Sequence, residues 1–260
     1  MSEEILITAL NEGVFTVTLN RPKANAFNDE LIAALKAALK QAERDDEIRA
    51  IIIAATGKLF SAGQDVTAFD GDEPRSFRKH LLKTYNPLIL QMRKLEKPII
   101  AAINGAVAGA ALGIVLACDL RIASEKARFV VGFGGIGLAP DSAVSLMLPT
   151  IIGLGRATEA VFLNDAINAE QAFTWGLANK VVATDELEAE AQAWGARLAR
   201  GPINAMGLTK RDFNKAILPN LAERLDYEAH IQDIAGTGPD HKEGLKAFLG
   251  KRDPDYRKAG

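Results

Sequence analysis

The stretch PIIAAINGAVAGAALGIVLAC, residues 98–118, decides how this chain folds. It opens with a continuous apolar run at 99–103, the pattern of a strand that is covered on both faces. A turn of small residues follows, and the apolar segment 110–118 then predicts a helix. Glycine in such a turn allows a ligand to approach the backbone N–H groups closely. The stretch therefore predicts a strand–turn–helix unit with an accessible backbone at its turn.

A second glycine-containing turn lies upstream in similar surroundings. Residues 57–65 read GKLFSAGQD and directly follow the apolar run 50–55, which predicts another buried strand. N–H groups at the start of a helix have no intrahelical partner and carry partial positive charge. Two such turns facing one cavity can bind a developing oxyanion. Each segment alone leaves a simpler alternative open, that its glycines only make a tight turn.

The rest of the N-terminal half alternates strand and helix patterns. Asn28 is a typical N-cap for a helix that carries apolar residues at helical spacing from Leu31 to Leu39. A long amphipathic helix is predicted over 73–95, and further strands are predicted at 5–7, 14–19, 120–123 and 129–131. The recurring strand–strand–helix unit indicates an α/β (α+β) fold built as a coiled stack of similar turns rather than a Rossmann sheet.

From about residue 141 onward the strand patterns nearly vanish. Helices are predicted at 141–152, 155–162, 169–175, 185–199, 202–216, 218–235 and 239–249. Because no low-complexity linker separates the two parts, the last helices are expected to pack on the core or on a neighbouring subunit. We divide the chain into a core of residues 1–200 and a C-terminal helical region of residues 201–260.

The composition disfavours nucleic-acid and membrane partners and excludes sites built from several cysteines. The 260 residues include 31 Lys and Arg against 33 Asp and Glu, which gives 31 − 33 = −2 and no net basic field for nucleic acid or anionic membrane. Cys118 is the single cysteine, so an intrachain disulfide and a cysteine metal site are excluded. The three histidines show no metal-ligand spacing, and no metal site is predicted. The N-terminal residues lack the basic and apolar regions of a signal peptide, which predicts a cytoplasmic protein.

Three motifs in order resemble the crotonase (enoyl-CoA hydratase/isomerase) superfamily over essentially the full length. Residues 21–28 (RPKANAFN) resemble the segment that lies along coenzyme A, and residues 60–65 and 97–119 resemble the two oxyanion-hole loops. The resemblance implies a spiral of repeated ββα units with a C-terminal trimerisation or lid region. It also implies an acyl-CoA substrate without a further cofactor, and an assembly as homotrimers or dimers of trimers.

The resemblance assigns roles to individual residues. The N–H groups of Gln64 and Ala110 would hold the thioester carbonyl oxygen, and two such donors stabilise the enolate formed by proton abstraction beside a thioester. Ala110 stands where many relatives carry glycine, and it keeps the donor unless φ must be positive. The expected contacts to substrate and coenzyme A come from Lys23, Ala24, Ala26, Ala62, Gln64, Asp65, Val66, Phe133 and Leu138.

Two positions depart from the pattern of the hydratases in this superfamily. Those enzymes use two glutamates around a water molecule, and the matching positions here carry Gly113 and Phe133. Neither side chain can transfer a proton, so hydration by two bases is disfavoured.

Asp141 is the candidate base instead. Residues 137–142 (GLAPDS) resemble the ring-epoxide isomerase branch of the phenylacetate pathway and related Δ3,Δ2-enoyl-CoA isomerases, in which this aspartate is the base. An alternative is that Asp141 only caps a helix over 142–152. An apolar lining would raise its pKa, whereas a helix N-terminus would lower it. Ala143 and Val144 stand where relatives carry glycine, and their bulk is an expected constraint on the acyl pocket.

The sequence thus predicts an acyl-CoA isomerase that shifts a 3-enoyl to a 2-enoyl thioester or opens a ring epoxide. One alternative is a hydratase-like lyase with a relocated base, for which Asp65 is the nearest candidate, although this residue is expected to fix its own loop. Another is a non-catalytic homologue that binds acyl-CoA or RNA. The acidic balance and the two intact turns argue against RNA binding.

Overall fold

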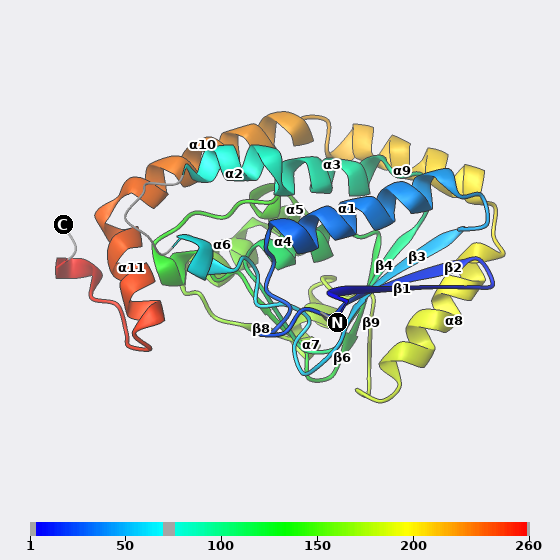
Figure 1. Ribbon diagram of the computed structural model, residues 1–260, viewed down its shortest axis with the longest axis horizontal. Coiled ribbons are helices and arrows are strands. Elements are labelled where there is room, and N and C mark those ends of the chain that lie inside the picture. Colours follow the sequence, from blue (N-terminus) through cyan, green and yellow to red (C-terminus); the bar gives the residue numbers. More distant parts are fainter. Residues whose placement is uncertain (1–3, 70–75, 259–260) are drawn as a thin grey trace.

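The computed structural model describes residues 4–69 and 76–258, and a six-stranded sheet forms its centre (Figure 1). The strands lie in the order β1-β2-β3-β4-β6-β9, with β1 antiparallel to β2 and all later neighbours parallel. They comprise β1 (Leu6–Asn11), β2 (Val14–Leu19), β3 (Ala50–Ala55), β4 (Ile99–Ile103), β6 (Leu120–Ser124) and β9 (Lys180–Val182). The predicted mixed α/β class is confirmed.

A smaller sheet of three strands stands beside the first. It contains β5 (Ala106–Ala108), β7 (Arg128–Val130) and β8 (Ile167–Asn168), with β5 parallel and β8 antiparallel to β7. The sequence pattern predicts only a turn where β5 lies and no strand at β8 or β9. Strands of two or three residues are too short to carry a period-two pattern, so their pairing is set by tertiary contacts.

Apart from the segment before β4, the helices follow the predicted pattern with small shifts at their ends. They are α1 (Asp29–Arg44), α2 (Phe77–Lys83), α3 (Tyr85–Lys94), α4 (Ala110–Ala117), α5 (Val144–Ile152), α6 (Leu154–Phe162), α7 (Ala169–Thr174), α8 (Leu187–Ala199), α9 (Ile203–Ile217), α10 (Leu221–Thr237) and α11 (Pro239–Leu249). Single 3₁₀ turns lie at Val66–Phe69, Gly134–Ile136 and Tyr256–Lys258.

The single helix predicted over 73–95 is wrong, because the chain breaks it into α2 and α3 at Thr84. Pro87 explains the break, since it has no N–H to donate to the carbonyl of Lys83 and its ring crowds that carbonyl. Thr84 therefore leaves the helical conformation, with φ −113° and ψ −83°. The predicted start near Pro74 lies outside the described residues.

The central strands β3 and β4 of the large sheet are buried on both faces. On one face α8 packs over a cluster that includes Ile52, Ile100 and Ile122. On the other face α1, α3 and α4 cover the main core, to which Ile51 and Ile53 belong. The continuous apolar runs of β3 and β4 are therefore explained by burial on two sides.

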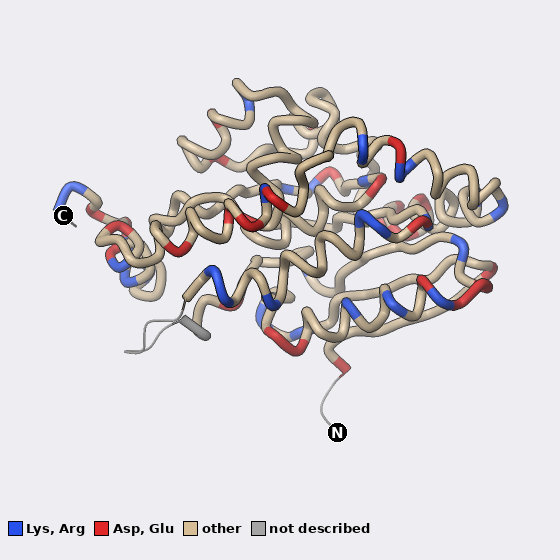
Figure 2. Tube along the Cα trace, turned by 90° about the horizontal axis from the view of Figure 1, so that it is seen from above, with Lys and Arg blue, Asp and Glu red and all other residues tan. Residues whose placement is uncertain are grey.

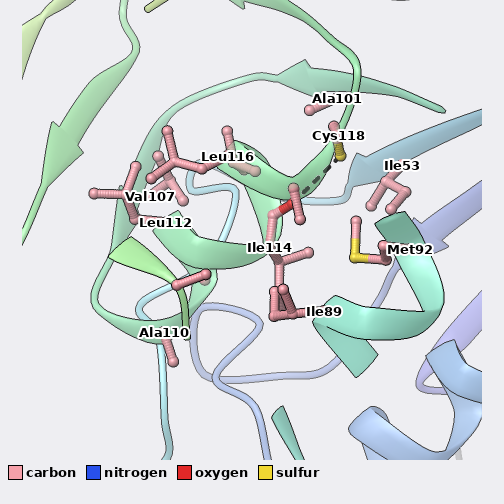
Figure 3. Packing of buried hydrophobic residues seen from close by; sticks show 14 of the residues in the cluster. Ile53, Ile89, Met92, Ala101, Val107, Ala110, Leu112, Ile114, Leu116 and Cys118 are labelled. Atoms are coloured by element: carbon pink, nitrogen blue, oxygen red, sulfur yellow. Dashed lines mark hydrogen bonds between the residues drawn. The ribbon is translucent and has the colours of Figure 1, made fainter. Parts of the chain in front are cut away.

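Helix α4 lies wholly inside the protein, and Figure 3 shows its side chains among those of β3, β5 and α3. Every residue of the helix is buried, which is typical of a helix that is apolar on all sides. The thiol of Cys118 donates to the carbonyl of Ile114, and burial raises the pKa of this thiol to about 12. Because its surroundings are packed, α4 holds its first residue, Ala110, in a fixed position.

The last helices pack on the core described above. Helix α10 lies along α2 and α3, and α11 lies against the 3₁₀ turn Gly134–Ile136 (Figure 1). Acidic and basic residues are interspersed on the face shown in Figure 2, in keeping with the balanced composition. Within residues 4–69 and 76–258, none of the helices has the length and apolar character needed to cross a membrane. The division at residue 200 stays a prediction.

Candidate active site

A cavity of about 910 Å³ lies where the two glycine turns, α2, α10 and α11 meet. It is lined by most of the residues that the sequence nominated: Lys23, Ala26, Ala62, Gln64, Asp65, Val66, Ala110, Phe133, Leu138 and Asp141. Of the nominated residues, all of which the structure describes, Ala24 alone does not line it. The carbonyl of Ala24 instead accepts a hydrogen bond of 3.0 Å from the N–H of Ala62. Ala24 therefore supports the first turn through a backbone hydrogen bond, without lining the cavity.

The segment after β2 makes a strained turn at the edge of the cavity. Lys23, Ala24 and Asn25 all take left-handed backbone conformations, with φ of 65°, 64° and 49°. Asn25 is buried and holds this turn, because its side chain accepts from the N–H of Arg21 and donates to the carbonyl of Thr56. Left-handed residues outside glycine persist only where their surroundings fix them. The turn places Lys23 on the cavity lining.

The two glycine turns are joined by backbone pairing. Ser61 and Val107 form a parallel bridge, and the N–H of Ala108 donates to the carbonyl of Ser61 at 3.0 Å. Gly63 has φ of 89°, and a Cβ atom there would lie 2.7 Å from the carbonyl oxygen of Ala108 and 3.6 Å from the nitrogen of Ala110. Only glycine allows this approach. The first turn therefore faces the start of α4.

Gln64 and Ala110 line the cavity from these two turns. Across the described part of the chain, neither the N–H of Gln64 nor that of Ala110 donates to a protein acceptor. Ala110 is the first residue of α4, where an N–H has no intrahelical partner and the helix dipole is positive. Gly109 has the positive φ of this turn, 55°, and Ala110 is not among the described residues with positive φ. Alanine at 110 therefore retains the donor.

The side chain of Gln64 is anchored by two groups from α2 and α3. Its Oε1 accepts from the hydroxyl of Tyr85 at 2.8 Å and lies 3.1 Å from Nε2 of His80. Its Nε2 donates to the carbonyl of Asp65 at 3.2 Å. Burial, with a smaller contribution from Asp141, raises the pKa of Tyr85 well above its ordinary value, so the phenol stays a donor. These contacts hold the backbone of Gln64 in place.

Asp65 is bound within its own loop. It accepts from the hydroxyl of Thr67 at 2.6 Å and pairs with Arg21 at 2.8 Å. The Thr67 hydroxyl, with help from Arg21, holds the pKa of this carboxyl below its ordinary value. An ionised, paired carboxylate is a poor proton acceptor. The contacts fit the expected loop-fixing role.

Asp141 presents the buried carboxyl group of the cavity lining. Its side chain is almost inaccessible, with 5% exposure. Oδ1 accepts from the hydroxyl of Ser142 at 2.7 Å, and Oδ2 accepts from Nε2 of Gln232 at 2.8 Å. Burial raises the pKa of Asp141 to about 6, and the two hydrogen bonds act in the opposite direction. A carboxyl with this pKa can accept and return a proton near neutral pH.

The alternative role of Asp141 as a helix cap is wrong. Helix α5 begins at Val144, and its N-cap position is Ala143. The cap is provided by Glu228 from α10, whose carboxylate accepts from the N–H of Ala143 at 2.7 Å and from that of Ser145 at 3.0 Å. Burial, against these hydrogen bonds, raises the pKa of Glu228 to about 7.

Gly113 and Phe133, which stand where a hydratase has its two glutamates, both have packing roles. A Cβ atom at Gly113 would lie 2.3 Å from the carbonyl oxygen of Ser142, so any side chain there collides with the backbone beside Asp141. Phe133 contributes apolar surface to the cavity. Ala143 and Val144 are fully buried in the core and do not line the cavity. Their bulk therefore affects packing in the core and does not narrow the acyl pocket directly.

Several buried polar residues of the site were not predicted from the sequence. They hold the turns, cap α5 or line the cavity, and they are Asn25, Ser61, Tyr85, Glu228, Gln232 and His241. A signal was present for two of them. Glu228 and Gln232 are one turn apart on the face of α10 that also buries Leu225 and Ala229. Polar residues within a buried apolar stripe indicate specific partners.

Comparison with known proteins finds similarity along the whole chain. A family model described as "Enoyl-CoA hydratase/isomerase" matches residues 9–259. The chain is 39% identical to 1,2-epoxyphenylacetyl-CoA isomerase of Escherichia coli (strain K12), over 97% of this chain and 98% of the relative. It is 35% identical to trans-2-decenoyl-[acyl-carrier-protein] isomerase of Streptococcus mutans, over 98% of each chain.

A solved structure gives the same picture of the fold. The crystal structure of an enoyl-CoA hydratase from Mycobacterium avium subsp. paratuberculosis matches with a TM-score of 0.88 and 33% identity, over 97% of this chain and 98% of that chain. The predicted spiral architecture is confirmed by this match.

Proposed function

Because the chain belongs to the enoyl-CoA hydratase/isomerase family, we propose that it isomerises an acyl-CoA thioester with Asp141 as its single acid–base group. The observation that carries the proposal is the buried carboxyl of Asp141 on the cavity lining, with a pKa raised to about 6. Positions 113 and 133, which would hold the two glutamates of a hydratase, carry no titratable group. Members of this family act on acyl-CoA substrates, so a small-molecule substrate follows from membership.

The proposed reaction begins with the thioester carbonyl between the two glycine turns. The N–H groups of Gln64 and Ala110 stabilise the negative charge that develops on its oxygen. Asp141 removes a proton from a carbon near the thioester, which leaves an enolate and a protonated carboxyl. The same carboxyl returns the proton to a different carbon, and the double bond has moved from the 3 to the 2 position. One carboxyl suffices because the proton is transferred and water is not added.

The direct test compares isomerisation of 3-enoyl-CoA with hydration of 2-enoyl-CoA. Asp141→Asn is expected to lower kcat for isomerisation by about 10²- to 10⁴-fold, the usual contribution of a general base. Asp226→Asn, on the exposed side of α10, is the control and is expected to retain activity. The relocated-base alternative predicts that Asp65→Asn abolishes hydration. Strong hydration that survives Asp141→Asn would contradict the proposal.

Opening of a ring epoxide is the second candidate reaction. It is supported by the similarity to the isomerase of Escherichia coli. Its product is an isomer of its substrate, so the same carboxyl and the same two N–H donors can serve it. An assay with a ring-1,2-epoxyphenylacetyl-CoA and with an aliphatic 3-enoyl-CoA of similar size, compared by kcat/KM, distinguishes the two acyl classes.

A further inference from the structure

We propose that Gln232 is a positioning residue of the reaction, holding one oxygen of the Asp141 carboxyl and setting how readily that group accepts a proton. The inference rests on the proposed role of Asp141 as the base. Gln232 belongs to α10, far along the chain from the segment that carries Asp141, and it lines the same cavity.

The amide of Gln232 is held in one orientation by two hydrogen bonds. Its Oε1 accepts from the N–H of Ala139 at 3.1 Å, and its Nε2 donates to Oδ2 of Asp141 at 2.8 Å. An inverted amide would place Nε2 against the Ala139 N–H and Oε1 against the carboxylate, so neither bond would form. Gln232 is 1% exposed, so both bonds are shielded from bulk solvent.

Helix α10 holds the chain on both sides of Asp141. Gln232 binds the backbone at Ala139, and Glu228, one turn earlier, binds the N–H groups of Ala143 and Ser145. The helix itself lies along α2 and α3 (Figure 1). A site residue whose supports stand on a packed helix is placed more accurately than one supported by a loop.

The groups around Asp141 show why Gln232 affects its chemistry. Glu228 from α10 and Tyr85 from α3 interact with it electrostatically, whereas the Ser142 hydroxyl and Gln232 donate hydrogen bonds to it. The donors stabilise the carboxylate against the effect of burial. Loss of Gln232 as a donor should therefore leave Asp141 protonated up to a higher pH.

The test uses Gln232→Met, which keeps the length of the side chain and removes both hydrogen bonds. The acidic limb of kcat/KM against pH is expected to move upward by about one pH unit, since a bond to a charged group is worth roughly one unit of pKa. Activity at pH 6 then falls about fivefold by titration alone, and it recovers toward wild type as the pH rises. A merely structural loss would be the same at every pH.

The matched control is Gln192→Met on α8, where the lost partner is the hydroxyl of Thr16 on the far face of the sheet. Thermal unfolding of each variant verifies that it is folded at the assay temperature. If Gln232→Met does not fold, Gln232→Glu replaces it, because that side chain keeps its shape and its acceptor for Ala139. A second carboxylate beside Asp141 should move the acidic limb further upward.

Two readouts separate the inference from the proposed function. Titration of the Asp141 carboxyl by ¹³C NMR follows its pKa without substrate, and an upward shift in the Gln232 variants supports the coupling directly. An unshifted titration together with an unshifted limb overturns the inference while Asp141-dependent isomerisation still stands. If the wild-type protein does not isomerise, or Asp141→Asn retains full activity, the proposed function fails, and with it the positioning role.

Discussion

At the scale of single residues, the site concentrates features that lower stability. Asp141 and Glu228 are buried carboxyls with raised pKa values, and Ser142 and Ala143 both take left-handed backbone conformations, with φ of 55° and 66°. Such features persist where the surrounding structure fixes them, and they gather at functional sites. The segment at Asp141 has the features expected of a functional site, in keeping with the role proposed for it.

The raised pKa of Asp141 predicts a pH-dependent effect on stability. The folded state holds this proton up to about pH 6, whereas the unfolded chain releases it near the ordinary value of 3.8. Stability is therefore lost as the pH rises through that window, and the loss is complete above pH 6. Asp141→Asn should gain up to about 3 kcal/mol relative to wild type at pH 8 and much less at pH 4. Urea unfolding at the two pH values measures this, and an equal effect at both would contradict the raised pKa.

At the scale of elements, the site depends on how the two glycine turns pair. Their separation is set by the bridge between Ser61 and Val107 and by the close approach of Gly63 to Ala108. The two proposed oxyanion donors therefore belong to one paired unit and not to two independent loops.

Gly63→Ala tests this unit against a matched glycine. Gly63 and Gly57 both have positive φ, of 89° and 79°, but a Cβ at Gly57 meets no atom within 4 Å. Both variants should lose about 1 kcal/mol of stability from the strained backbone. Gly63→Ala should in addition lower kcat by about 10²-fold, because the first turn must move away from Ala108 and Ala110. Equal kcat values for the two variants would show that the pairing does not set the site.

The same scale shows what the sequence could predict. The long strands, the buried helix α4 and the two turns follow from local pattern, and Asp141 follows from a motif. The break between α2 and α3 was missed although Pro87 marks it. The contact between Gln232 and Asp141 could not be predicted from the sequence, because the two residues are 91 positions apart. Short strands such as β5 were not predicted, because a strand of two or three residues is recognised only by its hydrogen bonds to a neighbouring strand.

At the scale of the whole molecule, large apolar side chains remain exposed on and just after α6. Leu154, Phe162 and Leu163 are 73%, 80% and 64% exposed. Nearby Asn164 accepts from the N–H of Gly132 at 3.0 Å and lines the cavity, so this surface adjoins the site. An apolar surface of this kind fits the trimers or dimers of trimers that the sequence resemblance leads us to expect.

Phe162→Glu tests the assembly. A charge in an apolar interface is costly, so the variant should shift the mass measured by light scattering from an oligomer toward a monomer. Because Asn164 follows closely, kcat/KM should fall with the mass. Asp226→Asn serves again as the surface control. A wild-type protein that already has the mass of a monomer at micromolar concentration would exclude the assembly.

The contact between Gly113 and Ser142 also bears on how such enzymes diverge. The carbonyl of Ser142 occupies the space that a side chain at 113 would need, so a glutamate there and Asp141 in its present place exclude each other. Gly113→Glu alone is therefore expected to displace the backbone beside Asp141. A descendant that acquired the glutamate would have to remodel the segment around Asp141 as well. Divergence of this kind is easiest after gene duplication, when one copy keeps the older reaction.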